Sequence, residues 1–165
     1  MCNQERNTDI RTNQLSDAKG TSLSLTISGY QFPEIENDLH DSNWLNITGK
    51  VEHPRGSWAF VDPCMLTYEL EGLCDWLESV AANPNTSHQS MYFLEPNLGF
   101  HVVRTNEQTI LRVNLSHESG PPWREDREEW LNGVDLDFPL ESNDLATAAR
   151  VLQEQLSRYP QRAAA

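Results

Sequence analysis

Carboxylates gathered into short stretches are the residues of this chain whose type and spacing could do chemistry. Four acidic residues fall within eight positions that contain no Lys or Arg: Glu34, Glu36, Asp38 and Asp41. Oxygen ligands on alternate residues can bind calcium, but this stretch lacks the glycine and the spacing of an EF-hand loop. The same charges can also serve solubility alone, or they can pair with a basic protein and speed its association.

A second group of carboxylates lies close to two tryptophans. Residues 120–144 hold eight acidic residues against two arginines, and residues 62–78 hold five more with no Lys or Arg. Trp123 and Trp130 flank the acidic run of a long polar loop, so each either packs back on the domain or anchors a partner. The residues of this loop that we expect to contact a partner are Trp123, Glu125, Asp126, Glu128 and Glu129.

No arrangement of nucleophile, base or metal ligands accompanies these carboxylates in the sequence. There is no glycine-rich phosphate loop, the five histidines are not spaced as metal ligands, and the three cysteines match no zinc signature. We therefore predict no catalytic residue, no metal and no cofactor. A hydrolase site that combines carboxylates with His53 or His117 is the enzymatic alternative.

The net charge of −13 restricts the class of partner. Twenty-five Asp and Glu against 12 Lys and Arg exclude the basic footprint of a nucleic-acid-binding protein and disfavour docking on anionic membranes. A basic protein is the expected partner. The N-terminus has no apolar run of a signal peptide and the cysteine count is odd, so we expect a cytoplasmic protein.

Hydrophobic periodicity predicts the elements that position these groups. Residues 1–21 are polar and aperiodic, which indicates a disordered leader before a single globular domain at 22–160. Helical spacing predicts one helix at 69–82 and a second that begins at Ser142 and ends at Pro160, after which the QRAAA tail is expected to fray. Alternation predicts seven strands: 22–30, 43–52, 57–61, 89–95, 98–104, 109–116 and 134–140.

The short connections between these strands favour antiparallel pairing, because parallel strands need long crossovers. We therefore expect an α+β fold, mainly an antiparallel β-sheet or sandwich of about seven strands with two helices, the C-terminal helix packed on the sheet. The pattern does not fix strand order or oligomeric state.

The order of motifs resembles a known family. The segments GYQFPEIENDLHDSNWLNI, GSWAFVDPCMLTYELEGLCDWLE, MYFLEPNLGFHV and ILRVNL follow one another within residues 22–157, and this order is similar to that of the WapI-type immunity proteins of bacterial polymorphic toxin systems. The resemblance implies a non-enzymatic antidote that binds the toxic domain of a contact-delivered toxin, here a basic nuclease. It assigns no residue to toxin contact. The alternative is an interaction or regulatory module for another protein.

Overall fold

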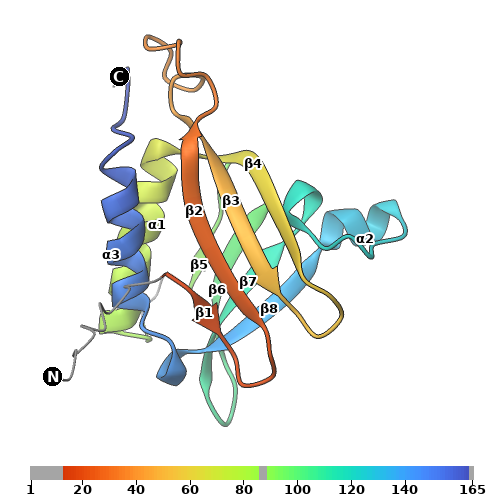
Figure 1. Cartoon of the computed structure of the whole chain (residues 1–165). Helices are drawn as coiled ribbons and strands as arrows, with labels where there is room; N and C mark the ends of the chain where they lie inside the picture. Colours follow the sequence, from red (N-terminus) through yellow and green to blue (C-terminus); the bar gives the residue numbers. More distant parts are fainter. Residues whose placement is uncertain (1–12, 86–88, 164–165) are drawn as a thin grey trace, which may run out of the picture.

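Two four-stranded antiparallel sheets and three α-helices make up the computed structural model, which describes residues 13–85 and 89–163 (Figure 1). The first sheet has the order β1-β2-β3-β4 and the second the order β5-β6-β7-β8. The α+β prediction is confirmed, with eight strands in the described residues. Their bounds are β1 Leu15–Ser16, β2 Ser22–Tyr30, β3 Trp44–Glu52, β4 Trp58–Leu66, β5 Ser90–Met91, β6 Leu98–Arg104, β7 Thr109–Leu115 and β8 Val134–Pro139.

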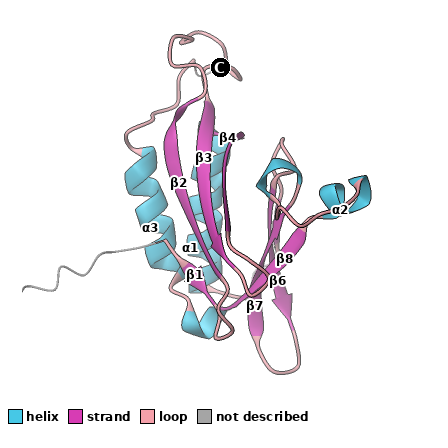
Figure 2. Ribbon diagram, turned by 45° about the vertical axis from the view of Figure 1, so that its right-hand side comes forward, coloured by secondary structure: helices cyan, strands magenta, loops and turns pink. Residues whose placement is uncertain are grey.

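A single hydrophobic core joins the two sheets and two of the helices. Alternate residues of each sheet face it, as Leu25 on β2 and Phe100 on β6 illustrate. Helix α1 (Thr67–Ala82) and helix α3 (Leu145–Leu156) lie side by side next to β2 (Figures 1 and 2). Leu77 of α1 and Leu152 of α3 meet those strand residues around one small gap, so the helices close one side of the core.

Two of the predicted strands have different lengths in the structure. The strand predicted at 57–61 continues to Leu66 as β4, through Pro63. Because β4 is an edge strand of the first sheet, a proline that lacks an N–H can be accommodated there. The strand predicted at 89–95 shrinks to β5, because the chain then turns towards α1, where the Leu94 N–H donates to Glu69 Oε1 at 2.7 Å.

The N-terminal boundary and the second helix also differ from the prediction. Leu15 is buried and β1 pairs with β2, so residues 13–21 belong to the fold; the rest of the predicted leader lies outside the described residues. Helix α3 begins after Asp144, whose Oδ1 accepts the Thr147 N–H at 2.9 Å, and not at Ser142. It ends at Leu156, and the residues that follow reach the end of β2, where the Tyr30 hydroxyl donates to the Pro160 carbonyl at 2.6 Å.

Candidate functional site

The first acidic loop (residues 31–43) connects β2 to β3 and lies beyond their ends, near the C-terminus (Figure 1). The side chains of all four predicted contact residues are exposed there: Glu34, Glu36, Asp38 and Asp41. Asp38 has a structural task, because its Oδ1 accepts the backbone N–H groups of His40 and Asp41 at 2.9 and 2.8 Å. These bonds lower the pKa of Asp38 and close a turn. Three carboxylates are therefore presented on a turn that the fourth holds.

Buried Asn43 and the C-terminal tail fix this loop to the domain. Asn43 Oδ1 accepts from Thr67 Oγ1 and from the Arg162 N–H at 2.9 and 2.8 Å, and its Nδ2 donates to the carbonyls of Leu39 and Arg162. The Arg162 guanidinium donates to two loop carbonyls and lies 3.7 Å from the Tyr30 ring centroid. The prediction that the tail frays is wrong at Arg162.

The second acidic segment (residues 117–133) is not an irregular loop throughout, because it contains helix α2 (Arg127–Asn132). Asp126 starts this helix by accepting the Glu129 N–H at 2.8 Å, and Glu129 Oε2 accepts the Glu125 N–H at 2.7 Å. Two of the four predicted carboxylates, Asp126 and Glu129, thus hold the turn. Glu125 and Glu128 are exposed beside them.

The two tryptophans of this segment have different surroundings. Trp123 packs back on the domain: its ring centroid lies 5.2 Å from that of Trp58, edge to face, and 5.1 Å from that of His53. The guanidinium carbon of Arg55 lies 4.8 Å from the Trp123 centroid. Trp130 lies on α2, is 38% exposed and is contacted by the Arg124 guanidinium at 4.2 Å. Of the two, Trp130 is the more available to a partner.

The structure does not bring the two acidic regions together. The first loop extends beyond β2 and β3, whereas α2 projects at the far side of the second sheet (Figures 1 and 2). Between them, Asp62 on β4 and Glu118 both accept from Asn97 Nδ2, at 3.1 and 3.0 Å. Partial burial and the nearby carboxylates Glu118 and Glu95 raise the pKa of Asp62. The carboxylates thus form separate groups.

Comparison with protein-family models shows the family of this chain. The model of the immunity protein WapI-like family matches residues 14–160, from just before β1 to the end of the α3 region. The chain belongs to the WapI-like immunity protein family. No curated protein matches it. The candidate sites of this family member are surfaces that could bind a toxin and cavities that could hold an active site.

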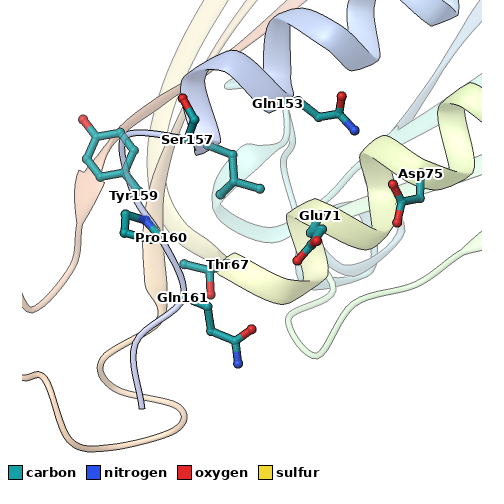
Figure 3. Close-up of a pocket in the computed structure, with 9 residues that line it drawn as sticks. Thr67, Glu71, Asp75, Gln153, Ser157, Tyr159, Pro160 and Gln161 are labelled. Carbon is teal, nitrogen blue, oxygen red and sulfur yellow. The ribbon is translucent and has the colours of Figure 1, made fainter. Parts of the chain in front are cut away.

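A hollow of about 330 Å³ lies between α1 and α3 of this WapI-like protein (Figure 3). Glu71 and Asp75 of α1 line it opposite Gln153 of α3, and the tail residues that follow α3 line one end. No histidine or cysteine is among its lining residues. Two exposed carboxylates from the acidic stretch 62–78 face it together with apolar surface from Leu156, Tyr159 and Pro160.

The groups needed for the hydrolase alternative lie in different places. His53 packs against tryptophans, and its Nδ1 accepts the Arg55 N–H at 3.1 Å. His117 lines a hollow that has no carboxylate among its lining residues. Burial raises the pKa of the Cys74 thiol to about 12 and that of Cys64 further, so both are protonated near neutral pH. Over residues 13–85 and 89–163 no three His, Cys, Asp or Glu side chains could hold a metal ion, and no helix could span a membrane.

Sequence reasoning missed the residues that position both acidic regions. Asn43 appeared only as the start of a strand and Arg162 only as part of a frayed tail. The local sign of the role of Asn43 was its position, as a polar residue directly before the strand that begins at Trp44. Arg55 gave no signal beyond its type, because its partner Trp123 is distant in the sequence. Arg124 lies close in sequence to its partner Trp130, but sequence reasoning counted it only as a charge.

Proposed function

We propose that this WapI-like protein is a cytoplasmic, non-enzymatic immunity protein that binds the toxic domain of a contact-delivered toxin and neutralises it. The toxin surface it fits is basic, as in a nuclease whose cleft binds nucleic acid. The observation that carries this proposal is the first acidic loop, which presents three exposed carboxylates on a stretch, residues 34–41, that contains no Lys or Arg. The Arg162 guanidinium beside this loop donates to the backbone carbonyls of Pro33 and Ile35. Such a loop attracts a basic surface and competes with phosphates for it.

Each acidic region has its own part in this proposal. Glu34, Glu36 and Asp41 supply steering and ion pairs, while Asp38 preserves the shape of the turn. On the second segment the contact residues are Glu125 and Glu128, whereas Asp126 and Glu129 maintain α2 and Trp123 holds the segment to the first sheet. The same surfaces could serve an interaction module for another basic protein, so the partner used in the test decides between the two functions.

The test measures association with the purified toxic domain encoded beside the gene for this chain. The variant Glu34→Gln/Glu36→Gln/Asp41→Asn removes three charges and retains the Asp38 turn. We expect its association rate constant at low salt to fall about tenfold and to depend less on salt, because steering is electrostatic. The nuclease activity of the toxic domain, with and without this protein, is measured in parallel.

A matched control removes three charges elsewhere. Glu71→Gln/Asp75→Asn/Glu78→Gln makes the same change in net charge on the exposed side of α1. If the two triple variants associate equally fast, the first loop has no special role. If the wild-type protein neither binds nor inhibits the toxic domain, the immunity function itself is wrong.

A further inference from the structure

Large exposed hydrophobic side chains are concentrated near one end of the second sheet. Among the described residues there are five of them, and four lie on two segments, the one after β5 and helix α2: Tyr92, Leu94, Trp130 and Leu131, with the fifth, Val61, on β4. Tyr92 is 74% exposed and Leu131 46%. Exposed apolar groups that cluster in this way mark interaction surfaces more often than scattered ones do.

Tyr92 and Leu131 line the same hollow, which has a volume of about 260 Å³. Gly99 on β6 and Asn114 on β7 are paired across the sheet and form its base, on the face directed away from the core. The Tyr92 ring contacts His101 edge to face at 5.3 Å on one side, and Leu131 of α2 stands on the other. Because Gly99 has no side chain, the base of the hollow is open.

The charges around the hollow indicate what could enter it. No Asp, Glu, Lys or Arg is among its lining residues. Both signs of charge lie beside it: Asp135 accepts from Asn114 Nδ2 at 2.9 Å, and the Arg124 guanidinium donates to the carbonyl of the lining residue His117 at 2.6 Å. Carboxylates are in excess there, because residues 117–135 hold six acidic residues against two arginines. An apolar hollow beside carboxylates is complementary to an apolar side chain that has Lys or Arg next to it.

We propose that this hollow receives one apolar or aromatic side chain of the basic toxic domain, which then contacts the exposed face of α2. The inference rests on the proposed immunity function and adds the contact that retains the toxin after association. The volume suits one side chain, since small-molecule sites usually span roughly 300–1,000 Å³. A second copy of this chain is a poor occupant, because each copy carries a net charge of −13 and the opposed carboxylates would repel.

The test fills the hollow from its base. In Gly99→Leu the new Cβ would lie 3.4 Å from His101 Nε2 and 3.9 Å from Asn114 Cβ, and Gly99 is not among the glycines with positive φ, so the backbone accepts the change. We expect binding of the toxic domain to weaken at least tenfold through faster dissociation, with the association rate unchanged. Val103→Leu, on the same face of β6, is the control and should bind as the wild type does.

A second variant removes the sides of the hollow in place of filling it. Tyr92→Ala/Leu131→Ala truncates two exposed residues, so it should fold normally, and it should also raise the dissociation rate about tenfold. Val61→Ala is its control, an exposed apolar truncation on the other sheet. If thermal unfolding shows that Gly99→Leu is unstable, the double variant decides. If the toxic domain dissociates from the double variant as slowly as from the wild type, the inference is overturned.

The possible outcomes separate the two levels of the proposal. If wild-type protein does not bind the toxic domain, the immunity function fails and this inference fails with it. If the wild type binds and the toxic domain dissociates from both hollow variants as slowly as from the wild type, the immunity function stands and the hollow is not the contact. If light scattering shows that wild type is a dimer and Gly99→Leu a monomer, a second copy occupies the hollow and the inference is wrong.

Discussion

The two acidic regions show the same pattern in the sequence but differ in how they are held and in what they expose. Polar contacts hold the first loop, chiefly those of buried Asn43 with Thr67 and Arg162. Aromatic contacts of Trp123 and the guanidinium of Arg124 hold the second segment. None of the exposed residues of the first loop is a large hydrophobic one, whereas the second segment exposes Trp130 and Leu131.

This difference separates two contributions to binding. Exposed charges act at a distance and mainly raise the rate of encounter, whereas apolar side chains exclude water only on contact and mainly slow dissociation. The first loop is therefore suited to steering a basic partner, and α2 with the adjacent hollow to retaining it.

The largest effect is expected where α2 joins β8. Gly133 has φ +64°, and a Cβ on it would lie 2.0 Å from the Leu115 carbonyl oxygen. Gly133→Ala should lower the free energy of unfolding by about 3 kcal/mol, because both a strained backbone and a clash with backbone must be relieved. Urea denaturation measures the loss. Gly20→Ala, also at positive φ but with no atom within 4 Å, is the control and should lose about 1 kcal/mol.

A slightly smaller effect is expected for the polar support of the first loop. Asn43→Ala leaves Arg162, Leu39 and Thr67 without their partner in a buried position. The free energy of unfolding should fall by about 2–3 kcal/mol, since each unsatisfied buried group costs about 1–3 kcal/mol. Asn37→Ala, exposed in the same loop, should change it by less than about 0.5 kcal/mol. Equal stability of the two variants would show that Asn43 does not support the loop.

The two tryptophans should divide stability from binding. Trp123→Ala removes the contacts with Trp58 and His53 and should lower the free energy of unfolding by about 2 kcal/mol, less than for a core tryptophan because the ring is half-buried. Trp130→Ala should cost less than about 1 kcal/mol and yet speed dissociation of the toxic domain. Chemical denaturation and dissociation kinetics on both variants make the comparison. The reverse pattern would exchange the roles assigned to the two rings.

The sequence predicts the sheets well because alternation records burial directly. The buried and exposed residues of β2 and β3 follow the predicted pattern, and antiparallel pairing follows from the short connections. It does not predict β1, because two residues are too short for any periodicity. Nor does it predict the end of β5, where the contact of Leu94 with Glu69 depends on a helix 25 positions away.

For the candidate site, the sequence predicted the exposed acidic residues but not the contacts that hold them. The exposed carboxylates of residues 34–41 follow from their polarity and their loop position. Asp38, Asp126 and Glu129 accept backbone bonds from residues two to four positions away, and the spacing of Asp126 and Glu129 is the local sign of a helix cap that the prediction of a loop passed over. The hollow on the second sheet is beyond sequence reasoning, since Gly99, Leu131 and Tyr92 meet only through the pairing of strands and the path of α2.

The smallest expected effect concerns Asp62, which lies between the two regions. Its pKa is raised in the folded protein by burial and by Glu118 and Glu95, so the folded state binds more protons than the unfolded state as the pH rises from the unfolded pKa to the folded one. Stability therefore falls as the pH rises through this window, and ionised Asp62 destabilises the protein at neutral pH.

Asp62→Asn should remove this cost while its amide oxygen still accepts from Asn97. At pH 7 the variant should be more stable than the wild type by less than about 1 kcal/mol, a small gain because Asp62 is only partly buried and solvent still screens its charge. Below the unfolded pKa of about 3.9 the gain should vanish, since Asp62 is then protonated in both states. Thermal unfolding across this pH range measures it, with Asp41→Asn as the exposed control. A gain that is independent of pH would show that packing, and not repulsion among these carboxylates, limits stability between the two regions.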